Sequence, residues 1–130
     1  MIKKVNVRST QREQLIDITS EIKQFVNESN TSEGRVTIFI PHTTAAVTIN
    51  ENADPDVQHD LIIALNRISP DLPEFNHMEG NSDAHTKSSI LGCSQDIIIN
   101  DGRLLLGTWQ GVYFCEFDGP RNRTAILRID

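Results

Sequence analysis

Two of the four histidines in this chain lie in one polar stretch, HMEGNSDAH at residues 77–85. No apolar period runs through the stretch, so packing into a core does not explain its composition. Clustered imidazole and carboxylate groups can bind a divalent metal ion or transfer protons. The spacing of His77 and His85 matches neither HExxH nor a zinc ribbon, so the local metal motif is weak and a solvated loop is the alternative.

A third histidine, His42, follows Pro41 at the end of an apolar segment and opens the polar sequence HTT, which includes Thr44. Functional side chains often lie where a rigid strand ends, so we predict that His42 and Thr44 border a site. For His42 taken alone, a loop histidine that is hydrogen-bonded to the backbone is the alternative.

Together, these three histidines could form a metal site. Three neutral imidazole nitrogens leave one position of a tetrahedral zinc ion open for water, as in catalytic zinc sites. We therefore predict His42, His77 and His85 as metal ligands and catalytic residues. Glu79 or Asp83 would then act as the general base or as the carboxylate that orients an imidazole.

The sequence NENAD at residues 50–54 offers oxygen ligands between a predicted strand and a predicted helix. Asn50 and Glu51 carry the hard oxygen atoms that Mg²⁺ or Ca²⁺ prefers, and we predict them as ligand-binding residues. No EF-hand spacing is present, and Asp54 is already explained as a helix cap. Ordinary loop residues are therefore the alternative.

Basic side chains in the second half of the chain could bind one small anionic group. Arg121 and Arg123 would each offer a bidentate fork, and Lys87 a point charge. A solvated surface role is the alternative for each of them taken singly.

The sequence GTWQG at residues 107–111 holds the only tryptophan of the chain. Trp109 and Gln110 could line a pocket in which the indole stacks on a planar ring. Alternatively, Trp109 fills the core beneath a hairpin turn.

Hydrophobic periodicity predicts the elements that must position these residues. Alternating patterns predict strands at residues 2–9, 14–18, 34–40, 45–50, 95–100, 103–109, 111–117 and 124–129. Helical patterns predict helices at residues 19–30 and 55–69, capped by Thr19 and Asp54, and one or two helical turns at 82–92. The fold class is therefore α+β, with a β-rich, largely antiparallel, sandwich-like sheet and two or three helices.

Length and charge narrow the class of protein. The 130 residues suit a single domain over 1–130, and a net charge of −6 argues against a nucleic-acid partner. No apolar run is long enough to span a membrane and no signal peptide is evident, so we expect a cytoplasmic protein without a membrane partner. Cys93 and Cys115 are predicted as small core residues in a reducing compartment.

Three long segments carry a resemblance to a known family: HTTAAVTINENADPDV, HMEGNSDAHTKSSILG and NDGRLLLGTWQGVYFCEFDGP. They resemble the YjbQ-like family, also called the secondary thiamine-phosphate synthase family, and the resemblance covers nearly the whole chain. It implies a compact β-rich fold, a homotrimer, and a pocket in which histidines hold a metal, often zinc. The positions that match the family's motif histidines are His42, His77 and His85.

The resemblance also implies an activity. A thiamine-phosphate synthase joins a pyrimidine pyrophosphate to a thiazole phosphate and releases pyrophosphate, and the word "secondary" indicates a side activity. The expected partner is a small, phosphorylated substrate, and magnesium is the alternative to zinc where the substrate is a pyrophosphate. Two other functions stay open: a metal-dependent hydrolase of a small metabolite, and a non-enzymatic trimer that binds a metabolite or metal.

Overall fold

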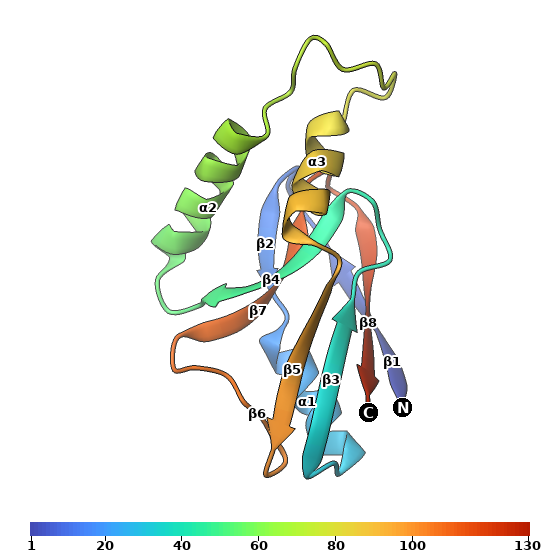
Figure 1. The fold of residues 1–130 in the computed structure, drawn as a ribbon, viewed down its shortest axis with the longest axis vertical. Coiled ribbons are helices and arrows are strands. Elements are labelled where there is room, and N and C mark those ends of the chain that lie inside the picture. Colours follow the sequence, from blue (N-terminus) through green and yellow to red (C-terminus); the bar gives the residue numbers. More distant parts are fainter.

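Antiparallel pairing organises the chain into two sheets (Figure 1). In the computed structural model, which describes residues 1–130, the larger sheet has the order β1-β8-β3-β5-β6 and the smaller β2-β7-β4. The strands are β1 (Ile2–Arg8), β2 (Gln14–Asp17), β3 (Glu33–Phe39), β4 (Ala45–Glu51), β5 (Ser94–Asn100), β6 (Arg103–Leu104), β7 (Gln110–Glu116) and β8 (Asn122–Ile129). The helices are α1 (Thr19–Ser29), α2 (Pro55–Ile68) and α3 (Ser82–Leu91). The predicted α+β, β-rich fold is confirmed.

The hydrophobic core lies between the two sheets and against α1. In β3, Val36 and Ile38 are buried because alternate side chains of a strand point to the same face of a sheet. They belong to one apolar cluster that also includes Val47 and Phe114 of the smaller sheet and Phe25 of α1. This shared core holds the ends of strands from both sheets in fixed relative positions.

The start of α1 differs from the prediction, whereas the start of α2 confirms it. Thr19 is not the cap of α1, because it lies in the first turn and the carboxylate of Asp17 accepts a hydrogen bond from its N–H at 2.9 Å. The Thr19 hydroxyl instead accepts a hydrogen bond from the Val112 N–H of β7 at 2.9 Å. At α2, Asp54 Oδ1 accepts from the Asp56 N–H at 2.9 Å, as expected of a cap.

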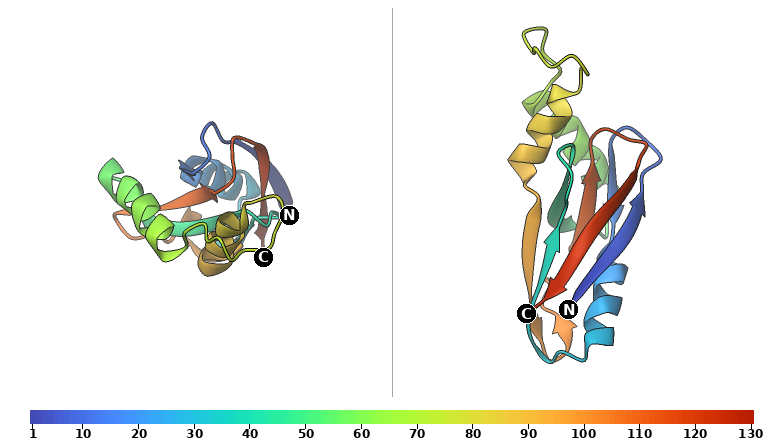
Figure 2. Two further views of the ribbon diagram at one scale, coloured as in Figure 1. Left: turned by 90° about the horizontal axis from the view of Figure 1, so that it is seen from above. Right: turned by 90° about the vertical axis from the view of Figure 1, so that its right-hand side faces the viewer.

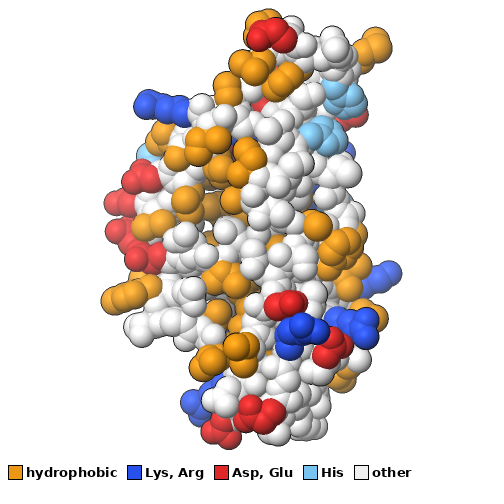
Figure 3. Space-filling model, viewed as in Figure 1, with side chains coloured by type: hydrophobic (Ala, Val, Ile, Leu, Met, Phe, Trp, Pro, Cys, Tyr) orange, Lys and Arg blue, Asp and Glu red, His pale blue; other side chains and the backbone are white.

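Helices α2 and α3 lie outside the shared core (Figures 1 and 2). Helix α3 is fixed to the smaller sheet, because Ser88 Oγ donates a hydrogen bond to the Ala45 carbonyl at 2.6 Å. Helix α2 has only one buried residue, Leu65. Apolar side chains are therefore exposed along this edge (Figure 3), among them Ile68 and Ile90. No helix has the length and apolar character needed to cross a membrane.

Two predictions about the second half of the chain are wrong, and one of the two alternatives for Trp109 is rejected. The strand predicted for 103–109 ends at Leu104, because the chain then leaves the edge of the larger sheet. Trp109 does not fill the core, since 62% of its surface is exposed. Cys93 is exposed and is not a core residue, whereas Cys115 is buried, and this burial raises the pKa of its thiol to about 12.

Candidate functional site

The predicted site histidines line one pocket, which we call the histidine pocket. It has a volume of about 440 Å³ and opens to solvent near the ends of β3 and β7, the start of α3 and the start of β8. Apart from one proline, every lining side chain is polar. The lining residues are Pro41, His42, Thr43, Thr44, His77, Glu79, Asn81, His85, Arg121 and Arg123.

His42 is a fixed, neutral imidazole on the strand side of this pocket. Its Nε2 accepts a hydrogen bond from the Thr124 N–H of β8 at 3.0 Å, and its ring meets Phe114 edge-on with the centroids 6.4 Å apart. Partial burial, together with the positive charge of Arg123, lowers the pKa of His42 below its usual value of 6.5. Since Nε2 is the acceptor, the proton of the neutral ring lies on Nδ1, which is then a hydrogen-bond donor.

His77 and His85 face each other on the other side. His77 lies in the segment between α2 and α3, and His85 lies on the first turn of α3. Their ring centroids are 5.4 Å apart and the ring planes are nearly perpendicular, at 88°. Two imidazoles that share a tetrahedral metal at about 2.1 Å would have their centroids roughly 5 Å apart, so the separation of this pair matches that of two ligands of one ion. The same geometry also suits direct edge-to-face packing.

The third predicted ligand does not join the pair in this arrangement. The lone pair of His42 Nε2 is directed at the Thr124 N–H, and Nδ1 carries a proton. No group of three or more His, Cys, Asp or Glu side chains is placed to hold a metal ion. The three-histidine metal centre therefore stays a prediction. His77 and His85 have a separation that suits it, whereas His42 would have to give up its hydrogen bond from the Thr124 N–H before it could bind the metal.

A buried ion pair forms the floor of the strand side. Arg123 Nε donates to Glu116 Oε1 at 2.9 Å, and Arg123 Nη2 donates to Thr44 Oγ1 at 2.8 Å. Ser9 Oγ also donates to Glu116 Oε1, at 2.7 Å. Burial alone would raise the pKa of Glu116, but the hydrogen bonds from Arg123 and Ser9 outweigh it and lower the pKa below 4.5. The predicted ligand-binding residues Thr44 and Arg123 thus lie at the pocket. Arg123, which holds Thr44, is itself positioned by Glu116, a carboxylate that sequence reasoning missed.

Asn81 is a second residue that sequence reasoning missed. Its Nδ2 donates to Glu79 Oε2 at 2.9 Å and to Asp118 Oδ2 at 2.7 Å, and Asp118 in turn accepts from Arg121 Nη2 at 2.8 Å. Asn81 Oδ1 is buried without any partner. A buried acceptor without a donor costs about 1–3 kcal/mol, so Asn81 is held here at some cost to stability. The only sequence signal was its place before α3, where it resembles a helix cap although its side chain makes no capping bond.

Lys87 and Asp83 do not line the histidine pocket. Lys87 is completely buried, and its Nζ donates to Asn66 Oδ1 at 2.6 Å and to Glu13 Oε2 at 3.1 Å. Arg12 Nη2 donates to both carboxylate oxygens of Asp83 at 3.1 Å. Burial alone would raise the pKa of Asp83, but the hydrogen bond and charge of Arg12 lower it. These contacts fix α3, and with it His85, against the rest of the chain.

The remaining predicted site residues lie together at the far end of β4. Glu51 pairs with Gln110, and Asn50 with Gly111, in the β4–β7 ladder. Since β4 runs from Ala45 to Glu51, this end lies about 20 Å from the histidine pocket along the strand. The structure thus divides the predicted ligand-binding residues into two separate groups, with Trp109 in the far one.

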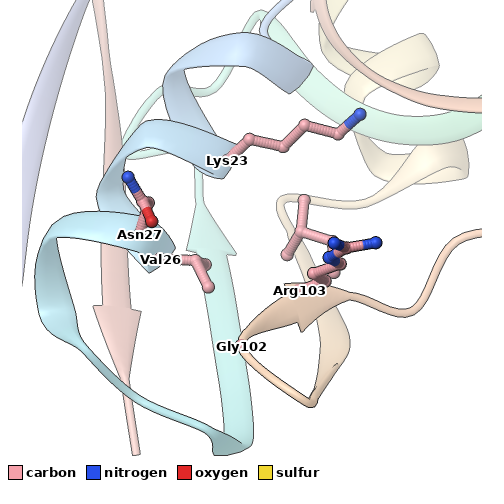
Figure 4. Close-up of a pocket in the computed structure, with 6 residues that line it drawn as sticks. Lys23, Val26, Asn27, Gly102 and Arg103 are labelled. Carbon is pink, nitrogen blue, oxygen red and sulfur yellow. The ribbon is translucent and has the colours of Figure 1, made fainter.

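A different pocket lies between α1 and the β5–β6 turn (Figure 4). It measures about 300 Å³, and Lys23 and Asn27 of α1 lie across it from Arg103 of β6. No histidine, cysteine or carboxylate lines it, so it offers neither a metal ligand nor an acid–base pair. The histidine pocket is therefore the stronger candidate site.

Comparisons with known protein sequences cover nearly the whole chain. The family model described as "UPF0047 protein YjbQ-like" matches residues 3–129. A UPF0047 protein of Methanocaldococcus jannaschii is 54% identical, with 99% of this chain and 94% of that protein covered. The UPF0047 protein YugU of Bacillus subtilis is 50% identical, with 99% and 98% covered.

Solved structures give the same result. A crystal structure of an uncharacterised yjbq/upf0047-family protein of Clostridium acetobutylicum has a TM-score of 0.96 at 49% identity, and the match covers 98% of this chain and 99% of the other. A YbjQ-like protein of unknown function from Sulfolobus solfataricus has a TM-score of 0.95 at 28% identity, with 99% and 95% covered. This chain therefore belongs to the YjbQ-like UPF0047 family.

Proposed function

We propose that this protein is an enzyme that acts on a small phosphorylated metabolite in the histidine pocket, and that its reaction is the formation of thiamine phosphate. The observation that carries the proposal is the lining of the pocket, in which three histidines and two arginines converge on a space of about 440 Å³ without a hydrophobic wall. Such a lining suits a charged, strongly hydrogen-bonding ligand rather than an apolar one. The family resemblance supports the choice of reaction.

The residues of the pocket suit the departure of pyrophosphate. In this reaction the thiazole nitrogen attacks the methylene carbon of the pyrimidine, and the carbon–oxygen bond breaks with its electron pair going to pyrophosphate. The product is a thiazolium cation, so no proton has to leave carbon. Negative charge develops on the departing oxygen, where Arg121 and Arg123 supply positive charge and His42 Nδ1–H donates a hydrogen bond.

A divalent metal, zinc or magnesium, belongs to the same proposal. It would supply further positive charge at the leaving group. His77 and His85 are the residues that would hold zinc, whereas magnesium would be bound by the pyrophosphate oxygens. Asn81 Nδ2 anchors Glu79 beside this pair, at 2.9 Å. Glu79 is thereby positioned to orient an imidazole or to accept a proton.

The decisive experiment supplies the purified protein with the pyrimidine pyrophosphate, the thiazole phosphate and Mg²⁺, and measures thiamine phosphate. We expect product from the natural protein and none from His77→Ala. His59→Ala is the matched control, because His59 lies exposed on α2 and is not in the pocket. Absence of product above a protein-free blank, at verified metal content, would refute the reaction for this chain.

The paired rings of His77 and His85 favour one second candidate, a metal-dependent hydrolase of a small phosphorylated metabolite. It predicts turnover of some phosphate ester in a substrate panel, loss of that turnover on chelation, and no reaction of the thiamine precursors. Binding without turnover of any compound would instead favour a metabolite- or metal-binding protein.

A homotrimer is the assembly that we propose, on the basis of the family resemblance. Its support in this chain is the exposed apolar edge along α2 and α3, which includes Ile63, Ile68 and Ile90. Sedimentation equilibrium at micromolar concentration should give a mass three times that of the chain. A monomer under these conditions would refute the assembly.

A further inference from the structure

A second polar hollow, which we call the arginine hollow, adjoins the histidine pocket. It measures about 420 Å³, and Arg121 lines both spaces. Its lining comes from the end of β1 and the turn that leads into β8. The lining residues are Arg8, Ser9, Thr10, Pro120, Arg121 and Asn122. None of them is a carboxylate, whereas the histidine pocket contains Glu79.

Two side chains of the arginine hollow are free to bind a ligand. Arg8 and Asn122 are directly opposite each other in the β1–β8 ladder, so their side chains lie on the same face with Cβ atoms about 5 Å apart. Both residues are exposed, and neither side chain makes a hydrogen bond or ion pair within the protein. The guanidinium of Arg8 and the side-chain amide of Asn122 therefore lie side by side at the surface, and no acceptor of the protein occupies their N–H groups.

The frame behind these side chains is rigid. Ser9 Oγ accepts a hydrogen bond from the Arg121 N–H at 2.8 Å and donates to Glu116 Oε1 at 2.7 Å. The Ser9 N–H also donates to the Arg121 carbonyl at 3.0 Å. Because Glu116 also holds Arg123, one buried carboxylate fixes the arginine hollow and the floor of the histidine pocket relative to each other.

We propose that the arginine hollow is a second anion subsite, which holds the phosphate monoester of one substrate while the histidine pocket holds the pyrophosphate of the other. A phosphate monoester presents several acceptor oxygens in the geometry that a guanidinium fork matches. The assignment of the two substrates rests on the proposed function. The bond to pyrophosphate breaks in the histidine pocket, so the pyrimidine pyrophosphate lies there. The thiazole phosphate is then anchored by Arg8 and Asn122. Arg121 lies between the two anions and contributes to both.

The first test measures binding alone, with methyl phosphate as the probe. The side-chain amide signal of Asn122 in a ¹H–¹⁵N spectrum reports on this subsite and not on the histidine pocket. We expect saturable shifts of that signal, and about tenfold weaker binding in Arg8→Gln, as for loss of one charge-assisted hydrogen bond. Arg103→Gln is the matched control, since Arg103 is an exposed arginine on β6 that lines neither space.

The second test uses steady-state kinetics to separate the two substrates. Arg8→Gln should raise KM for the thiazole phosphate about tenfold and leave kcat and the KM for the pyrimidine pyrophosphate nearly unchanged, because Arg8 lies away from the breaking bond. Asn122→Asp, which replaces the free donor with a negative charge of the same shape, should have a larger effect in the same direction.

The outcomes separate this inference from the proposed function. Methyl phosphate binding that weakens in Arg8→Gln, in a protein that makes no thiamine phosphate, would support the subsite and refute the reaction. Thiamine phosphate formation with unchanged KM in both variants would support the reaction and refute the subsite. Methyl phosphate binding of equal strength in the natural protein, Arg8→Gln and Asn122→Asp would also refute the subsite.

Discussion

The two sides of the histidine pocket differ in how firmly the chain holds them. The strand wall consists of His42, Thr44 and Arg123, and the helix wall consists of His77, Glu79 and His85. The strand wall is tied to the sheets by the buried Arg123–Glu116 ion pair and by the hydrogen bond from the Thr124 N–H to His42 Nε2. The helix wall depends on the placement of α3 and on a segment whose side chains are exposed. One wall therefore contributes to the stability of the fold, while the other offers side chains that are free to meet a ligand.

The largest expected effect comes from breaking the ion pair beneath the strand wall. Glu116→Ala should lower the free energy of unfolding by about 3–5 kcal/mol, because it leaves the buried Arg123 guanidinium without its counter-charge. Urea unfolding followed by circular dichroism measures the change. The double variant Glu116→Leu/Arg123→Leu should recover part of the loss, and equal destabilisation by single and double variants would contradict the explanation.

The next effect is on zinc affinity, which should depend on the histidines of the helix wall and much less on the histidine of the strand wall. If zinc binds to the helix wall, His77→Ala and His85→Ala should each weaken its affinity by at least about a hundredfold, since even outer partners of a ligand change affinity about 10- to 100-fold. His42→Ala should have a much smaller effect, because its Nε2 is bonded to the Thr124 N–H. Competition with a chelator of known affinity measures this. Equal losses in the three variants would mean that His42 gives up its hydrogen bond and joins the metal.

The fold was largely predictable from the sequence. Most strands bury one face, so apolar and polar residues alternate along them in the sequence. The patterns at 34–40 and 45–50 correspond to β3 and β4 within one or two residues. The prediction failed at 105–109, where leucines continue the apolar pattern but no regular strand ladder continues beyond Leu104. Local composition does not contain the information that an edge strand ends after two residues.

The site was predictable only in part. The histidines could be grouped because their chemistry is rare in the chain. Glu116 could not be identified, because its importance depends on Ser9, which is 107 residues distant in sequence, and on a turn that brings Arg123 back to it. The role of Lys87 was not predictable either. Its partner Glu13 is 74 residues distant in sequence, so the sequence does not reveal that the charge of Lys87 is paired within the fold. Contacts between distant segments decide whether a charged side chain serves the fold or the pocket.

Acid should weaken the buried ion pair beneath the strand wall. The pKa of Glu116 is lowered in the folded protein, so its contribution to stability is complete above its ordinary value of 4.5 and is lost as the pH falls through the folded value. Asp83, whose pKa is also lowered, contributes in the same direction from its ordinary value of 3.8. The free energy of unfolding should therefore decrease as the pH falls below about 4.5. Glu116→Gln should be less stable at pH 7 but should show a flatter dependence on pH, and an unchanged slope would contradict this assignment.

The smallest expected change in stability is also the sharpest test of the comparison. His77 is exposed, and its ring is in contact with His85 alone among the aromatic side chains, so His77→Ala should alter the free energy of unfolding by no more than about 0.5 kcal/mol. The same variant should abolish thiamine phosphate formation and weaken zinc binding by at least about a hundredfold. A large loss of stability in metal-free protein would show that the helix wall carries part of the fold. A stable variant without activity would establish that the residues that stabilise the fold around the pocket differ from those that bind the metal and act on the substrate.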